Sequence, residues 1–394
     1  MSEVEDARAA SGTKVAAAPH RGVALLLPLA LLVLLVGGLT LADPARWLGS
    51  TAPPPEEVAF DRVTLTDTGF VALVRNAAAA DVTIAQVMVD DAFWEFRIEP
   101  DAHLRPFESA TLTIEYPWVE GEPHVLAILT HTGLVWEHEI AVATRTPQPE
   151  PAALLDYALI GILVGFLPVA AGMAFFPAMR QAPGRWLAAL LAFTLGLLAF
   201  LAVDTVGEGL ELAEAVPGSY QGLGVFFGAA LLAVVGVLAL DRLTKGSPWG
   251  LALLIAIGIG LHNMGEGLLI GSAFALGSLA LGTTLIIGFA VHNVTEGPAI
   301  VAPLVRGGSL PWGRFLALAA VAGLPTVLGA WLGAFASWSV LPVVFFGLGA
   351  GAIVVVLVQV GGAIRKHGDV LRPLPMLAFA LGYAVMLATS LLTT

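Results

Sequence analysis

Long apolar runs restrict the fold of this chain more than any other feature. A helix needs about 20 apolar residues to cross the hydrocarbon core of a bilayer, which is roughly 30 Å thick. With 57% hydrophobic and 12% charged residues, the composition also agrees with an integral membrane protein. We therefore expect an α-helical polytopic membrane protein. The runs that predict its membrane spans are residues 22–42, 154–178, 186–206, 220–240, 249–271, 279–304, 313–335, 341–362 and 374–392.

The positions of Lys and Arg predict the orientation, because loops rich in these residues stay in the cytoplasm. The connections near 207–219, 272–278 and 336–340 contain neither residue type. Nine spans with a cytoplasmic N-terminus place the C-terminus outside a cell membrane. Basic residues precede the first run or lie in every second connection of the later eight: Arg8, Lys14, Arg21, Arg180, Arg185, Arg242, Lys245, Arg306, Arg314, Arg365, Lys366 and Arg372.

The first apolar run has two interpretations. A cleaved signal peptide usually has an apolar core of about 7–15 residues after a basic segment. Here the run is longer and the leading segment has three acidic residues beside its three basic ones, which favours a retained anchor helix. Cleavage would leave the other eight spans unchanged. The predicted organisation is a cytoplasmic N-terminus (1–21), an anchor helix (22–42), a Pro-rich linker (43–57), a β-domain (58–147) and a helical domain (154–394).

Residues 58–147 differ in character from the rest of the chain. Segments such as "RVTLTD", "FVALVRN", "DVTIAQVMV", "FWEFRI", "ATLTIEY", "HVLAILT" and "LVWEHEIAVA" alternate apolar and polar residues between turn residues. Seven such strands in about 90 residues predict an immunoglobulin-like β-sandwich, which the topology places outside the cytoplasm. The chain has no Cys, so neither a disulfide nor thiolate chemistry is expected.

Four histidines lie in this β-domain: His103, His124, His131 and His138. Pairing the last two strands through the "TG" turn separates three of them along the strands. We therefore expect surface histidines, with weak metal capture together with Glu137 and Glu139 as the alternative.

The same polar pattern occurs twice inside apolar runs: "HNMGEG" begins at residue 262 and "HNVTEG" at residue 292. Residues four apart lie on one face of a helix, so each copy presents a His and a Glu together. A carboxylate at mid-membrane costs roughly 2.5–3.5 kcal/mol on insertion scales. Neither run contains Lys or Arg, so a divalent cation is the simplest counter-charge, although a neutral polar packing contact is the alternative.

With these two copies and the eight-helix count, residues 154–394 resemble the ZIP (Zrt/Irt-like) transporters of divalent metals. The resemblance implies a metal site in the transport path, with no enzymatic activity and no cofactor apart from the transported ion. It also implies a rocking or elevator-like motion of one helix group against the other. The ligands that it implies are His262, Asn263, Glu266, His292, Asn293 and Glu296.

Several positions depart from the family pattern. The Pro that often precedes the motif Glu is replaced by Gly265 and Thr295, and an acidic position after the second motif His is Asn293. In "GLPTVLGAWLG", Thr326 stands where many relatives have Glu. Because these changes remove negative charge, we expect one tightly held metal rather than two. The loop "DRLTKGSP" also lacks the histidines found in some relatives.

An acidic set lies at the outer end of the second helix of the eight. Asp204, Glu208 and Glu211 share one helical face. They form either a solvated helix end or an outer entrance that attracts cations, in which Asp204 reaches the metal path.

Imidazole, carboxylate and amide ligands suit Zn²⁺, Fe²⁺ or Mn²⁺ and disfavour Cu⁺. Zn²⁺ is the first expectation for the cargo, carried into the cytoplasm. The alternatives are an intramembrane metal-dependent hydrolase, which lacks a His-Glu-x-x-His element here, and a non-transporting metal sensor. The expected partners are the metal ion and the lipid bilayer, without nucleic acid, and a homodimer is left open.

Overall fold

The computed structural model describes residues 30–35, 37–38, 56–181, 186–244, 247–336, 340–367 and 372–391. The chain divides into two compact units, residues 1–54 and 55–394, and each is described by itself. In the first unit, residues 30–35 and 37–38 are helical. The remainder of the expected anchor (22–42), the N-terminus (1–21) and most of the linker (43–57) lie outside the described residues.

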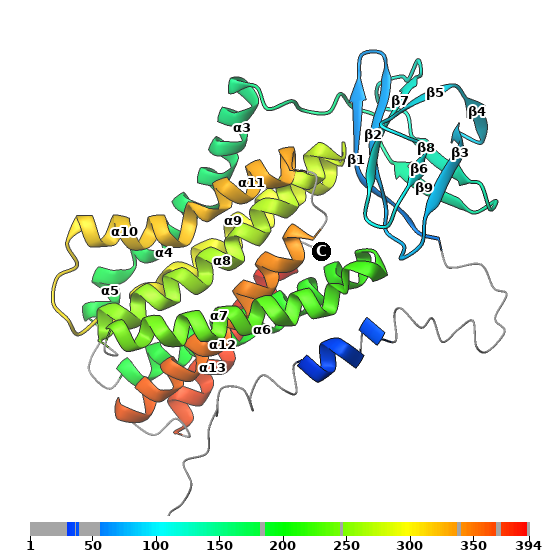
Figure 1. Cartoon of the computed structure of the whole chain (residues 1–394). Helices are drawn as coiled ribbons and strands as arrows, with labels where there is room; N and C mark the ends of the chain where they lie inside the picture. Colours follow the sequence, from blue (N-terminus) through cyan, green and yellow to red (C-terminus); the bar gives the residue numbers. More distant parts are fainter. Residues whose placement is uncertain are drawn as a thin grey trace, which may run out of the picture. The chain divides into compact units, whose positions relative to one another are not determined.

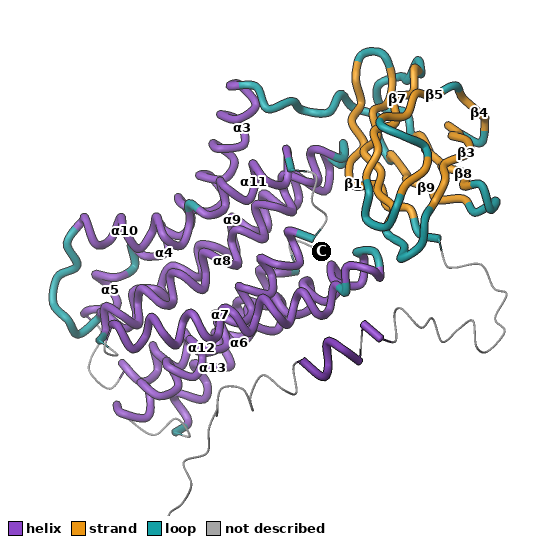
Figure 2. The backbone as a smooth tube through the Cα atoms, viewed as in Figure 1, coloured by secondary structure: helices purple, strands orange, loops and turns teal. Residues whose placement is uncertain are grey.

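Among the described residues of the second unit, eight helical segments are long and apolar enough to cross a membrane, as the sequence predicts after residue 150. Figures 1 and 2 show these helices after the strands in chain order. The first segment comprises α3 (Pro151–Gly161), a π-helical turn (Ile162–Phe166), α4 (Leu167–Met173) and α5 (Phe176–Gln181). The others are α6 (Leu187–Ala215), α7 (Gly222–Thr244), α8 (Pro248–Ala275), α9 (Leu279–Val301), α10 and α11 (Trp312–Gly323, Pro325–Phe335), α12 (Leu341–His367) and α13 (Pro373–Ser390).

Apart from the turn between α4 and α5, the eight segments have two interruptions of regular α-helix that the sequence did not predict. The π-helical turn at Ile162–Phe166 widens the first segment, and such turns change which backbone carbonyls are free to accept other bonds. In the sixth segment, Pro325 has no N–H to donate, so α10 ends at Gly323 and α11 starts afresh. Both interruptions lie beside the polar centre described below.

Helix α8 lies at the centre of the helical part and packs against α9, α10, α11 and α12. Its close contact with α11 depends on glycine residues, which have no side chain. A Cβ on Gly267 would collide with the carbonyl oxygen of Thr326, and one on Gly329 would collide with that of Met264. Small residues of this kind let helix backbones approach closely inside a membrane, where lipid gives no hydrophobic drive between helices.

The strands form a β-sandwich of two antiparallel sheets. One sheet has the order β1 (Val58–Thr66), β2 (Gly69–Asn76), β7 (Ser109–Glu115) and β5 (Phe96–Glu99). The other has the order β4 (Ala92–Trp94), β3 (Val82–Val89), β8 (His124–Thr130) and β9 (Val135–Ile140), with the short β6 (His103–Leu104) also paired to β3. Phe70, Leu112 and Ile128 are fully buried members of the core between the sheets.

The sequence predicted seven strands, whereas the described region has nine. The segment "FWEFRI" does not form one strand: its first part, β4, pairs with β3, and its second part, β5, pairs with β7 in the other sheet. The chain changes sheets at Glu95, which belongs to neither strand. Alternation of apolar residues continues through such a crossing, so the pattern alone could not reveal it.

Candidate metal centre

The two motif copies lie near the middle of α8 and α9, which pack against each other. One helical turn separates His262 from Glu266 and His292 from Glu296, so each pair shares a face. The four residues are at most 2% exposed. The apolar helices therefore bury two imidazoles and two carboxyl groups where no solvent reaches them.

Three of these four side chains converge. One ligand atom from each of His262, Glu266 and His292 lies within 4.8 Å of the other two. Within the first pair, His262 Nε2 is 3.4 Å from Glu266 Oε1, and within the second, His292 Nε2 is 3.7 Å from Glu296 Oε1. Glu296 therefore lies next to the group without belonging to it in this conformation. Among the described residues, no other set of His, Asp and Glu side chains converges in this way.

The motif asparagines connect the centre to the interrupted helices. Asn263 Nδ2 donates to the carbonyl oxygen of Ala322, near the end of α10, at 3.1 Å. Asn293 Nδ2 donates to the carbonyl oxygen of Val164 in the π-helical turn and to Glu266 Oε2, both at 3.0 Å. The amide nitrogens thus hold the surrounding backbone, which leaves the amide oxygens for other partners.

Several buried polar atoms in this centre have no hydrogen-bond partner among the described residues. An unsatisfied buried acceptor costs about 1–3 kcal/mol, so this concentration is expensive unless another species satisfies it. Neither α8 nor α9 contains a Lys or Arg to neutralise the carboxylates. A divalent cation would satisfy both the charge and the open lone pairs. The atoms are Asn263 Oδ1, Glu266 Oε1, His292 Nε2, Asn293 Oδ1, both carboxyl oxygens of Glu296, and Thr326 Oγ1.

The acidic set on α6 is divided by the structure. Asp204 is half-buried and accepts a hydrogen bond from Ser390 Oγ of α13 at 3.2 Å. Glu208 has one buried carboxyl oxygen without a partner among the described residues, and Glu211 is exposed. None of the three belongs to the converged group. A role as an outer entrance therefore stays a prediction.

One residue of the centre was not anticipated from the sequence. Thr205 on α6 is fully buried, and its hydroxyl oxygen lies 2.9 Å from Nδ1 of His262. It lies next to Asp204, but no motif spacing relates a threonine in one helix to a histidine 57 positions later. Only the packing of α6 near α8 reveals the contact.

The β-domain histidines do not converge, as expected, but the expectation that all four are surface residues is wrong for His124. Its ring is 5% exposed, lies against Phe70 and Tyr116, and is within 2.8 Å of the Asp90 carboxylate. It is buried because it sits on the inner side of β8 next to the core. His103 and His131 are exposed.

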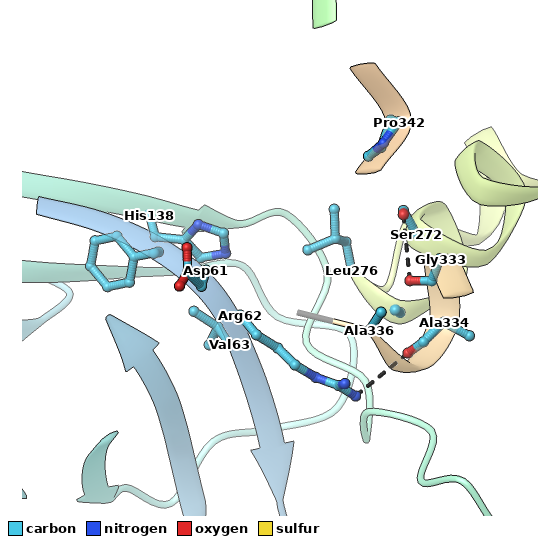
Figure 3. A pocket seen from close by; sticks show the side chains of 12 residues that line it. Asp61, Arg62, Val63, His138, Ser272, Leu276, Gly333, Ala334, Ala336 and Pro342 are labelled. Atoms are coloured by element: carbon cyan, nitrogen blue, oxygen red, sulfur yellow. Dashed lines mark hydrogen bonds between the residues drawn. The ribbon is translucent and has the colours of Figure 1, made fainter. Parts of the chain in front are cut away.

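A cavity in the second unit offers no comparable chemistry. It is lined by residues of β1, α8, α11 and α12 together with His138 (Figure 3). The Arg62 guanidinium donates to the carbonyl oxygens of Phe335 at 2.7 Å and Ala334 at 3.5 Å. Asp61 is paired with Arg75 at 2.6 Å. The charged groups here already have partners, in contrast to those between α8 and α9.

No protein-family model and no curated protein sequence matches this chain.

Proposed function

We propose that this protein carries divalent transition-metal cations across a membrane, and that the cluster between α8 and α9 binds the ion on its way. The observation that carries the proposal is the convergence of His262, Glu266 and His292 within 4.8 Å in the buried middle of two apolar helices. A cation held at this depth is neither at a surface nor at a soluble active site. Transport accounts for this location directly, because a transported ion has to pass through the interior of the helical part.

The ligand chemistry supports Zn²⁺ as the first candidate cargo. Two imidazoles and one carboxylate are a common set for Zn²⁺, and a fourth position is open to another donor. Glu296 is one such donor, because its carboxyl oxygens accept no hydrogen bond from the described residues and Oε1 lies 3.7 Å from His292 Nε2. The Oδ1 atoms of Asn263 and Asn293 likewise have no hydrogen-bond partner among the described residues. Fe²⁺ and Mn²⁺ accept the same donors, whereas Cu⁺ prefers sulfur ligands.

The resemblance to the ZIP transporters supports the same function and extends it. It rests on the paired His-Asn-x-x-Glu-Gly motifs and on the eight helices, and it assigns inward transport of the ion to the cytoplasm. We also infer that the β-domain is immunoglobulin-like. Its sheet orders β1-β2-β7-β5 and β4-β3-β8-β9 correspond to an A-B-E-D sheet facing a C′-C-F-G sheet.

The proposal is tested by metal influx into liposomes that contain the purified protein. We expect Zn²⁺ to enter liposomes that contain the wild-type protein, and the flux to fall at least about tenfold in His262→Ala and Glu266→Gln. Mutation of a residue that only contacts a metal ligand typically lowers metal affinity or activity by about that factor, and these two variants remove the ligands themselves. His131→Ala is the matched control, since this histidine is exposed in the β-domain. Its flux should equal that of the wild type.

Two results would contradict the proposal. Normal flux in correctly inserted His262→Ala protein would remove the site from the path. Stoichiometric Zn²⁺ binding by the wild type without any flux would instead favour a sensor or a metal-dependent enzyme.

A further inference from the structure

Thr205 makes two hydrogen bonds with a single hydroxyl group. Its Oγ1 lies 2.7 Å from the carbonyl oxygen of Leu201, one helical turn earlier, and 2.9 Å from Nδ1 of His262. A carbonyl oxygen can only accept, so the hydroxyl proton must point to Leu201. The oxygen of Thr205 is then left as an acceptor toward the imidazole.

This arrangement decides which nitrogen of His262 carries the proton. If Nδ1 had no proton, two acceptors would face each other at 2.9 Å, or the hydroxyl would turn and leave two oxygens in contact at 2.7 Å. Neither is stable in a fully buried site. Nδ1 therefore carries a proton, so Nε2 is the ring nitrogen that can give its lone pair to an ion bound between it and the Glu266 carboxyl group.

We propose that Thr205 is a positioning residue that holds His262 in the Nδ1–H tautomer, so that Nε2 is ready to bind the metal ion. Nε2 is the nitrogen 3.4 Å from the Glu266 carboxylate, on the side of the converged group. The proposal rests on the proposed function, because it names how one ligand of that site is prepared. It adds a residue of α6, outside both motifs, to the metal centre.

The two histidines of the centre are consequently not equivalent. His292 Nε2 is buried and has no hydrogen-bond partner among the described residues. The ring of His262 is held at two points: by Thr205 at Nδ1 and by the edge-on ring of Phe346, with centroids 6.1 Å apart. His262 is therefore the preorganised ligand, and less free energy is needed to orient it when the ion arrives.

The test combines metal binding with a direct measurement of the tautomer. Thr205→Val keeps the shape of the side chain and removes the hydroxyl, whereas Thr205→Ser keeps the hydroxyl. Thr194→Val is the matched control, because Thr194 is a buried threonine (1% exposed) about three turns earlier in the same helix, and the described hydrogen bond to His262 comes from Thr205 instead. Zn²⁺ affinity is measured by titration of the full chain in detergent. The tautomer is read from the ¹⁵N shifts of the His262 ring in metal-free protein at a pH where the ring is neutral, with His262→Ala used for assignment.

We expect a pyrrole-type shift at Nδ1 and a pyridine-type shift at Nε2 in the wild type. Thr205→Val should give a mixture of tautomers and a Zn²⁺ affinity lower by about 10- to 100-fold. Thr205→Ser should restore both readouts to nearly wild-type values, and Thr194→Val should change neither. A purely structural role of Thr205 would alter stability without altering the tautomer.

The proposal is overturned if wild-type His262 carries its proton on Nε2, if Thr205→Val binds Zn²⁺ as the wild type does, or if Thr205→Ser behaves like Thr205→Val. Should Thr205→Val fail to fold, the wild-type tautomer and the Ser variant still decide. Failure of the proposed function gives a different result, because a wild-type protein that binds no Zn²⁺ would still show the Nδ1–H tautomer.

Discussion

At the scale of single residues, the neutral side chain of Asn293 limits the negative charge of the proposed metal centre. Glu266 and Glu296 are the only acids in α8 and α9, and two carboxylates balance one dication. A second dication a few ångströms away would be repelled strongly in a medium of low dielectric constant. We therefore expect one tightly bound ion per chain in the wild type.

Replacing Asn293 by Asp tests this charge argument. In the wild type, the Asn293 amide donates hydrogen bonds to the Val164 carbonyl oxygen and to Glu266 Oε2. The carboxylate of the variant would face the same two acceptors without a proton to donate. The metal-free variant should be destabilised by about 3–5 kcal/mol, the range for an uncompensated buried charge. Excess Zn²⁺ should recover the stability and raise the bound metal from one to two ions per chain, as measured by thermal unfolding and by elemental mass spectrometry.

Asn76→Asp provides the matched control for this experiment. Asn76 is also fully buried, and its Nδ2 donates to the carbonyl oxygens of Ala80 and Leu104 in the β-domain. It should be destabilised in the same way, but Zn²⁺ should not rescue it. A stoichiometry of one ion in Asn293→Asp, or of two equal ions in the wild type, would show that charge does not limit the number of ions.

The residues of the candidate centre also show which contacts the sequence predicts and which it does not. Helical periodicity placed His262 with Glu266 and His292 with Glu296, because a spacing of four residues fixes a shared face. It could not show that Glu296 stays outside the converged group, or that Thr205 contacts His262, because both depend on how helices rotate and pack. Contacts between helices depend on tertiary packing and are not encoded in any spacing.

At the scale of helices, the contact between α8 and α11 holds one wall of the metal centre. A Cβ on Gly329 would collide with the backbone of Met264 and Leu268, so the helices would have to separate. Gly329→Ala should lower stability by about 1–3 kcal/mol, as overpacking does in a close-packed interior. The expected observation is a lower thermal unfolding midpoint in detergent together with weaker Zn²⁺ binding.

Gly236→Ala is the control for this change. Gly236 is exposed within α7, and an added Cβ would meet nothing within 4 Å. Because Ala favours a helix over Gly by up to about 1 kcal/mol, this variant should be as stable as the wild type or more so. Equal destabilisation of both variants would rule out backbone collision as the cause.

Among the strands, the hairpin between β3 and β4 depends on Asp90. Asp90 and Asp91 have φ angles of 52° and 64°, which a two-residue type I′ turn requires. The carboxyl of Asp90 accepts bonds from Tyr116 Oη, Val125 N and His124 Nδ1. Partial burial raises its pKa, but these three bonds outweigh that effect and leave the pKa lowered.

Because the folded pKa of Asp90 is lowered, its stabilising effect is present above the unfolded value of about 4 and is lost as pH falls through the folded value. Asp90→Asn should therefore weaken the hairpin near neutral pH, by at most about 1 kcal/mol because the side chain is 39% exposed. Hydrogen exchange of the β3 and β8 amides in the full chain measures this effect. The difference from the wild type should shrink below pH 4, and a difference that grows on acidification would contradict the assignment.

The strands also show which features of the β-domain the alternation of apolar and polar residues predicts and which it does not. Alternation identified β1, β2, β3, β7, β8 and β9 because each presents one face to the sandwich core. It joined β4 to β5, because apolar alternation persists while the chain crosses from one sheet to the other at Glu95. The positive φ angles at the Asp90–Asp91 turn were likewise invisible, since Asp-Asp is not a typical type I′ pair.

At the scale of the whole chain, eight apolar helices establish compatibility with a membrane, and the charge of their connections predicts its sidedness. The connection that contains Arg306 and Arg314 should face the cytoplasm, whereas the end of α6 and the β-domain should face outside. Whether the proposed transport would be influx or efflux depends on this orientation. The absence of Cys from the sequence makes a clean measurement available.

Single cysteines placed at exposed positions report the orientation in intact cells. We expect Thr132→Cys in the β-domain and Ala215→Cys at the end of α6 to react with a membrane-impermeant maleimide added outside. Ser309→Cys, exposed between Arg306 and Arg314, should react only after the membrane is permeabilised. The wild type is the unlabelled control because it has no thiol. Labelling of Ser309→Cys in intact cells, together with protection of Ala215→Cys, would show that the topology is the inverse of the expected one. The proposed metal centre would then serve export from the cytoplasm.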